Sequence, residues 1–135
     1  MHAAINLRKN LDQLRLGGKE PKVIIMGDFN DEPTNPSINR GLSAGNKRKN
    51  VSLGEYYNLF HDAHNLRDEG SYSYQGRWNM LDQIIVSYNL LNREKGLSAS
   101  WVGGKVYQED WMLYESEKYG DKFPSATYGG TTYYG

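Results

Sequence analysis

The sequence predicts a mixed domain of helices and sheet, of the α+β class, from three segments with clear patterns. Residues 2–16 carry apolar side chains at spacings of three and four, residues 22–27 are a run of apolar and mostly β-branched residues, and residues 71–75 alternate polar with aromatic. The first pattern indicates an amphipathic helix and the other two indicate strands. The 135 residues are expected to form a single domain, 1–135.

The first of these elements belong to one unit of a layered structure. The helix is expected to end at Gly17-Gly18, because glycine adopts the left-handed conformation that terminates helices. The strand at 22–27 follows after a surface turn. Its core, Val-Ile-Ile-Met, has no polar alternation, so we expect it to be buried on both faces.

The middle of the chain is less regular. Residues 36–41 favour a short helix with proline in its first turn, residues 43–54 an exposed loop, and residues 56–66 a weak helix. Residues 79–87 are expected to form a strand.

A turn at residues 76–78 is expected to join this strand to the one at 71–75. Residues 97–107 are predicted to add further strand. The chain from Gly120 has no period and is expected to be loop or an unfinished element.

Charge and cysteine content exclude several classes of protein. Lys plus Arg and Asp plus Glu each number 16, so the chain has no basic stripe of the kind that grips nucleic acid. The one basic cluster, residues 47–49, is typical of a solvated loop. No cysteine is present, which rules out disulfides and thiolate metal sites. No segment reads as a signal peptide or membrane span, and nothing indicates a compartment.

The first candidate site lies where the strand at 22–27 ends. Asp28 and Asn30 are two residues apart, so in extended backbone they point the same way. A carboxylate that deprotonates or aligns water, next to an amide that donates to a phosphoryl oxygen, suits water attack on phosphorus. The alternative is that both residues only stabilise a turn through Asx hydrogen bonds.

Asp82 is the second candidate, as the one charged residue of the predicted strand 79–87. A carboxylate inside an apolar strand is costly unless another group satisfies it. It then either orients a catalytic histidine or makes a structural hydrogen bond to a neighbouring side chain. His61 and His64 share a helical spacing but have no third metal ligand at a suitable distance in sequence.

The C-terminal half is rich in aromatic residues, which either stack on a substrate or complete a small core. Arg77 and Trp78, in the turn before Asp82, are the pair expected to face substrate. Arg77 would contact a phosphate there.

Two segments carry a family resemblance. VIIMGDFN (residues 23–30) resembles the Gly-Asp-Phe/Leu-Asn motif of the endonuclease/exonuclease/phosphatase family, the deoxyribonuclease I-like enzymes. RWNMLDQIIVS (residues 77–87) is similar to the family's later Asp-containing strand, with Gln83 where an aromatic is more usual. The resemblance covers nearly the whole chain and corresponds to the C-terminal half of the family's domain.

The resemblance implies a four-layer α/β/β/α sandwich, represented here by that half, and a Mg²⁺-dependent phosphoester hydrolase. By the same resemblance, Asp28 aligns the attacking water, Asn30 contacts the phosphate, both lie near the metal, and Asp82 pairs with a histidine. The family's metal-binding Glu belongs to a half that precedes this segment, and its Ser-Asp-His is expected beyond Gly135.

Three expectations follow from that partial match. Mg²⁺ binds weakly to one or two protein groups, so the isolated chain is expected to be weakly active or inactive. A bare sheet face is expected either to drive self-association or to leave the chain marginally stable. The substrate is expected to be a small phosphoester in preference to nucleic acid. The alternative function is a non-catalytic module that binds a ligand or partner on an aromatic surface.

Overall fold

The computed structural model describes residues 1–45, 51–91, 96–118, 120, 122–125, 128–129 and 132–133, the last two pairs as backbone only. The predicted α+β class is confirmed, because helices and strands are both present. In chain order the elements are α1 (His2–Gln13), β1 (Ile24–Asp28), η1 (Ser37–Gly41), β2 (Ala44–Gly45), β3 (Tyr56–Asn58), α2 (His61–Arg67), β4 (Tyr72–Tyr74), β5 (Arg77–Asn79), β6 (Asp82–Ser87), η2 (Tyr88–Leu90), η3 (Asp110–Met112), β7 (Leu113–Glu115), β8 (Lys122–Pro124), β9 (Tyr128–Gly129) and β10 (Thr132–Tyr133).

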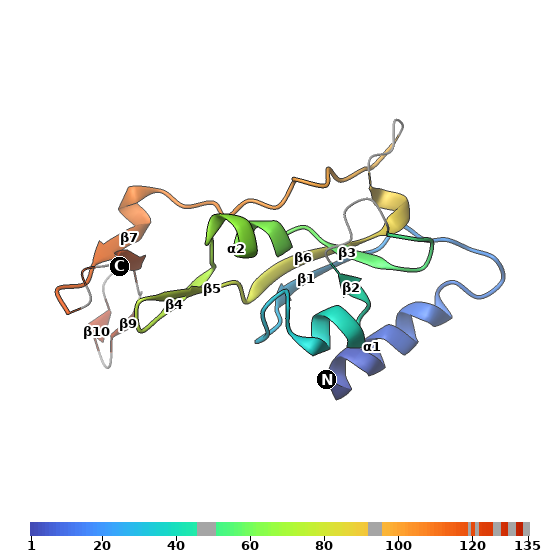
Figure 1. Cartoon of the computed structure of the whole chain (residues 1–135), viewed down its shortest axis with the longest axis horizontal. Helices are drawn as coiled ribbons and strands as arrows, with labels where there is room; N and C mark the ends of the chain where they lie inside the picture. Colours follow the sequence, from blue (N-terminus) through green and yellow to red (C-terminus); the bar gives the residue numbers. More distant parts are fainter. Residues whose placement is uncertain are drawn as a thin grey trace.

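The main sheet has the order β1-β6-β3-β2 and is antiparallel except between β2 and β3. In the β1–β6 ladder, Ile24 lies opposite Val86 and Asp28 opposite Asp82. Figure 1 shows α2 on one side of this sheet and α1 with η1 on the other. Helices therefore lie on both faces of the sheet, and β1 and β2 are its two end strands.

The face toward α1 holds the smaller apolar cluster. Leu11 from α1 and Ile38 from η1 pack with Ile85 from the centre of the sheet. Leu7 and Ile25 pack against the same cluster while still partly exposed. The predicted helix and strand are thus present and packed together, because the leucine face of α1 covers β1 and β6. The expected end of the helix at Gly17-Gly18 is wrong, since α1 ends at Gln13 and residues 14–17 form a turn.

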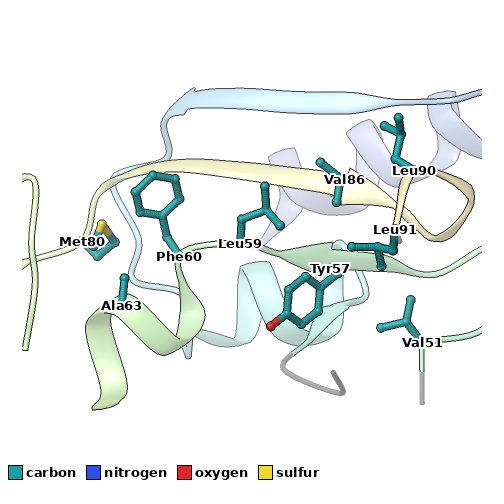
Figure 2. Packing of buried hydrophobic residues seen from close by; sticks show 9 residues of the cluster. All are labelled: Val51, Tyr57, Leu59, Phe60, Ala63, Met80, Val86, Leu90 and Leu91. Carbon is teal, nitrogen blue, oxygen red and sulfur yellow. The ribbon is translucent and has the colours of Figure 1, made fainter. Parts of the chain in front are cut away.

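The opposite face holds the larger cluster, drawn in Figure 2. Tyr57 and Val86 are register partners on β3 and β6, and Ala63 brings α2 onto them. The Tyr57 ring also meets Trp101 edge-on, with ring centres 5.0 Å apart. The buried members are Val51, Tyr57, Leu59, Phe60, Ala63, Met80, Val86, Leu90 and Leu91.

The expectation that the first strand is buried on both faces is wrong. Ile24 is 50% exposed and Met26 is 74% exposed, whereas Ile25 points into the α1 side of the sheet. The reason is position: β1 is the end strand of the described sheet, and α2 covers β3 and β6 rather than β1 (Figure 1). Sequence hydrophobicity cannot distinguish a central strand from one that leaves a face open.

Residues 56–66 do not form one helix. Tyr56–Asn58 is strand β3, paired with β6, and helix begins only at His61. Tertiary pairing selects the strand here, since adjacent tyrosines have strong β propensity and weak helix propensity. The expected helix at 36–41 is present as η1, a π-type turn.

The predicted strand 79–87 is divided between two sheets. Asn79 ends β5, which pairs with β4, whereas β6 pairs with β1 and β3. The turn of the β4–β5 hairpin is Gln75-Gly76, and both residues have positive φ, of 50° and 78°. Such a turn needs the left-handed conformation at both positions, which Gly76 adopts without strain. Arg77 and Trp78 are therefore strand residues and not turn residues.

Three further segments differ from expectation. Residues 97–107 contain no strand beyond a single bridge between Ala99 and Leu91. After Gly120, where a loop or an unfinished element is expected, the chain contains the short strands β8, β9 and β10. The expected loop at 43–54 begins with the buried β2 residue Ala44 and ends near buried Val51, and residues 46–50 lie outside the described structure. Among the described residues, no helix is long and apolar enough to span a membrane.

Candidate active site at the end of β1

Asp28 and Asp82 form the last pair of the β1–β6 ladder, and both are exposed. Directly opposite residues of an antiparallel pair project to the same face, with Cβ atoms about 4.5–5.5 Å apart. The sheet therefore brings two carboxylates together that are distant in sequence. Two like charges at this separation repel one another and favour a cation or a cationic side chain between them.

Asp82 is not inside an apolar strand, contrary to the expectation from sequence. It is the first residue of β6 and is exposed to water, so its carboxylate has no burial cost to offset. The backbone around it is held by Ser71, whose Oγ accepts hydrogen bonds from Leu81 N at 3.2 Å and Asp82 N at 2.9 Å. The side chain is left exposed beside Asp28.

Asn30 lies two residues beyond the strand in a tight turn. Its backbone N–H donates to Asp28 Oδ1 at 2.8 Å, and its φ is 50°, in the left-handed region that asparagine tolerates. The Asx turn considered as the alternative is therefore present. It uses one carboxylate oxygen of Asp28 and the backbone of Asn30, so the Asn30 carboxamide is not consumed by it.

The loop after Asn30 is held by Asp31, which the sequence analysis did not single out. Asp31 accepts hydrogen bonds from Ser37 Oγ at 2.5 Å and from Asn35 Nδ2 at 2.8 Å. These hydrogen bonds, that of Ser37 above all, lower the pKa of the Asp31 carboxyl. An Asp followed four and six residues later by Asn and Ser, just before a short helix, is the signal that could have identified it.

A second residue missed from sequence is Gln83, which is buried next to Asp82. Its side-chain amide donates to the Asp31 carbonyl oxygen at 2.5 Å. The strand that carries Asp82 is thereby bonded directly to the loop that carries Asn30.

Arg77 and Trp78 are neighbours on β5, so their side chains point to opposite faces of the hairpin. Arg77 is opposite Tyr74 and exposed, whereas Trp78 is opposite Ser73 and packs close to Gly70. The two residues do not face one substrate together. The hairpin projects beyond the main sheet, past the end of β1 (Figure 1).

Tyr72 and Tyr74 share a face of the hairpin with Arg77, because alternate residues of a strand point the same way. Their rings stack at 6.5 Å between centres with an interplanar angle of 13°, and they are 48% and 58% exposed. The exposed aromatic surface of the hairpin is therefore this tyrosine pair and not Trp78.

The two histidines of α2 have local partners. His64 Nε2 lies 3.6 Å from Glu32 Oε1, and His61 Nδ1 lies 3.3 Å from Asp62 Oδ1. In the part of the chain that is described, no three His, Cys, Asp or Glu side chains converge as a metal site. Across the ladder from Asp82, a metal at the end of β1 would be held by Asp28 and Asn30 together with water or substrate. The oxygen chemistry of these two groups fits Mg²⁺, which is often held by one or two carboxylates together with water and substrate.

A cavity of about 340 Å³ lies between the N-terminal turn of α1 and the loop that follows β1. Asp28 and Asp31 line it together with apolar residues of α1 and η1, including Leu7 and Ile38. The candidate residues are thus next to a space large enough for a small organic group.

The chain as a whole belongs to a known family of hydrolases. The sequence model of the endonuclease/exonuclease/phosphatase family matches residues 1–135. This protein is therefore a member of that family, as its Asp28 and Asp82 motifs suggest. No curated protein and no solved structure matches the chain.

Proposed function

We propose that this chain carries part of the active site of a metal-dependent phosphoester hydrolase in which water attacks phosphorus. The single observation that supports it most is the pairing of Asp28 with Asp82 at the end of β1, next to the Asn30 turn. Membership of the endonuclease/exonuclease/phosphatase family favours a nuclease or phosphatase activity for this pair of carboxylates.

Each residue has a role that its position allows. Asp28 aligns or deprotonates the attacking water, and Asn30 donates from its carboxamide to a phosphoryl oxygen as charge develops there. Asp82 accepts a hydrogen bond from a histidine and stabilises its protonated form. His61 and His64 contact Asp62 and Glu32, and His2 is exposed at the start of α1. We therefore propose that this histidine comes from outside residues 1–135.

The metal in this proposal is Mg²⁺ or a similar divalent ion, held by Asp28 and Asn30. When bound, it supplies positive charge to the phosphoryl group. Two protein groups hold it weakly, so residues 1–135 alone are weakly active or inactive.

The domain proposed around this site is a deoxyribonuclease I-like four-layer sandwich, of which residues 1–135 form part of a single domain. The exposed face at Ile24 and Met26 is the one that a second sheet would cover. In the isolated chain we propose that a second copy covers this face. The apolar residues lie on the edge strand β1, and an open edge strand with exposed apolar residues favours pairing with another chain.

The substrate proposed is a small phosphoester in preference to nucleic acid. The chain carries equal numbers of acidic and basic residues, and the cavity beside Asp28 is partly apolar. Arg77, exposed on the hairpin beyond β1, is the candidate for a phosphate contact. Trp78 stays in the proposal only as a residue that supports the hairpin.

The test uses Mn²⁺ as a paramagnetic probe of the proposed metal site. In the 135-residue chain, Mn²⁺ is expected to broaden the amide resonances of Asp28, Asn30 and Asp82 first. Asp28→Asn is expected to abolish this broadening, and the exposed-charge control Glu117→Gln to leave it unchanged. Broadening elsewhere, or unchanged broadening in Asp28→Asn, would contradict the metal site without any reference to turnover.

The chemical step is tested with p-nitrophenyl phosphate and its diester in the presence of Mg²⁺ and a large excess of protein. Asp28→Asn is expected to lower the Mg²⁺-dependent rate by about 10²-fold or more, because it removes the water-aligning group. Where the unmodified chain hydrolyses either ester measurably, an equal rate in Asp28→Asn and Glu117→Gln would remove Asp28 from the mechanism.

A non-catalytic binding module is the second candidate, and the exposed Tyr72–Tyr74 stack favours it. Stacking on tyrosine suits a base or sugar ring and needs no metal. A titration with a nucleoside monophosphate separates the two: Tyr72→Ala weakens metal-free binding in a module, whereas Asp28→Asn does not.

A further inference from the structure

Gln83 is a fully buried polar side chain at the junction between the sheet and the candidate site, 2% exposed. Its Nε2 donates to Asp31 O at 2.5 Å and to Met80 O at 2.8 Å. Its Oε1 accepts from Asn58 Nδ2 at 2.6 Å. The amide thus uses two donors and one acceptor within the protein interior.

Asn58 continues the same network into the sheet. It is 0% exposed, and its Oδ1 accepts a hydrogen bond from Phe60 N at 3.0 Å. A continuous series of hydrogen bonds therefore runs from the backbone before α2, through Asn58 and Gln83, to the carbonyl of Asp31. Buried polar networks of this kind define one arrangement strongly when every member is satisfied.

The two ends of this network matter for the site. Gln83 follows Asp82 in the chain, and Asp31 follows Asn30. The bond between them therefore connects the strand that presents one candidate group to the turn that presents another. A backbone hydrogen bond also connects these segments, from Phe29 N to Leu81 O at 2.9 Å, but it lies before the Asn30 turn. Beyond that turn, the Gln83 side chain makes the connection to Asp31.

We propose that Gln83, supported by Asn58, is a positioning residue that holds the Asn30–Asp31 turn at a fixed place relative to Asp82. The effect of Gln83 on catalysis rests on the proposed function, whereas the effect of Gln83 on the position of the turn does not. An amide is required, because two carbonyl oxygens need donors and Asn58 needs an acceptor. An aromatic side chain at this position could not donate to both carbonyl oxygens and accept from Asn58.

Hydrogen exchange in the full 135-residue chain tests the structural part. Gln83→Met keeps the length of the side chain and removes all three hydrogen bonds, and Gln13→Met is the matched control on the exposed end of α1. Gln83→Met is expected to speed amide exchange by about tenfold or more at Asn35, Ile38 and Asn39, whose N–H groups are bonded within this loop. Exchange in α1 is expected to stay unchanged. Equal protection of the loop in both variants overturns the proposal.

Gln83→Glu provides a second variant in case Gln83→Met does not fold. A protonated carboxyl donates to one carbonyl oxygen and accepts from Asn58, whereas an ionised one faces the Asp31 and Met80 carbonyl oxygens with no donor. Protection factors of the loop are therefore expected to approach those of the unmodified chain at acidic pH and to fall at pH 8. A pH-independent protection factor in Gln83→Glu contradicts the proposal.

Kinetics test the catalytic part separately. Where Mg²⁺-dependent hydrolysis is measurable, Gln83→Met is expected to lower kcat by about tenfold or more with a smaller change in KM, because misplacement of Asn30 weakens contacts made in the transition state. If Gln83→Met speeds exchange in the loop but leaves kcat unchanged, Gln83 does not position the turn for catalysis. Absence of hydrolysis in the unmodified chain agrees with the weak or absent activity proposed for residues 1–135 alone, and the exchange result then decides the role of Gln83.

Discussion

Asp28 and Asp82 stand directly opposite each other as the last residue pair of the antiparallel ladder between β1 and β6. Both side chains are exposed, so the two negative charges meet at the surface and not in the core. Such a pair destabilises the sheet slightly unless a cation or a histidine comes between the carboxylates.

The first prediction follows from this repulsion. Asp28→Asn should raise the free energy of unfolding by about 0.3 kcal/mol at neutral pH and low salt, because it removes one of two opposed charges at an exposed site. The gain should disappear at about 1 M salt, where exposed charges are screened. Urea denaturation at the two salt concentrations measures it.

The control for this prediction is Glu117→Gln, which removes the same charge from an exposed position in another part of the chain. If both substitutions change stability equally, the effect comes from net charge and not from the Asp28–Asp82 pair.

The second prediction concerns pH and Asp31. Hydrogen bonds from Ser37 and Asn35 lower the pKa of the Asp31 carboxyl in the folded chain. The ionised form therefore stabilises the fold above the unfolded pKa of about 3.9, and this contribution is lost as pH falls through the lower folded pKa. Asp31→Asn should be less stable than the unmodified chain at pH 6, and the difference should shrink toward pH 2.

Urea denaturation between pH 2 and pH 6 measures the difference. Parallel stability profiles for Asp31→Asn and the unmodified chain would mean that the loop does not depend on the charge of Asp31.

The third prediction concerns association through β1. Met26 is 74% exposed on the open face of the edge strand, so Met26→Lys should weaken self-association by placing a charge in the contact. Leu66→Lys is the matched control, since Leu66 is also 74% exposed but lies on α2. Sedimentation velocity over a range of concentrations measures the change. A monomer at every concentration, or an equal effect of Leu66→Lys, is incompatible with a contact along β1.

The fourth prediction concerns Arg8, which connects α1 to the sheet. Its guanidinium binds Asp12 at 3.0 Å and the Gly54 carbonyl oxygen at 2.9 Å, and lies 5.3 Å from the centre of the Tyr56 ring. Lysine cannot make these contacts together, so Arg8→Lys should lower the free energy of unfolding by about 1–2 kcal/mol. Urea denaturation measures it.

Arg40→Lys, at an exposed position of η1, should change stability by less than about 0.5 kcal/mol. A loss as large as that of Arg8→Lys would show that any arginine replacement has this effect in the chain.

Local sequence patterns were sufficient to predict the presence of α1 and β1. The leucine spacing of residues 2–16 predicts α1, and the apolar run before Gly27 predicts β1 within one or two residues of its bounds. The same patterns fail at residues 56–58 and 79–81, where pairing with β6 and β4 decides the backbone. Propensity is a weak guide at such places, because the partner strand contributes more than the residue itself.

For the candidate site, sequence alone determined the residue types: an acid and an amide after a strand, and a second acid that it placed inside a later strand. It did not determine that Asp28 and Asp82 are register partners, that Met26 lies in the open, or that Gln83 reaches the Asp31 carbonyl. These depend on which strands pair and in which register. Register is a property of the whole sheet, since a shift of one residue would turn every side chain of a strand to the opposite face.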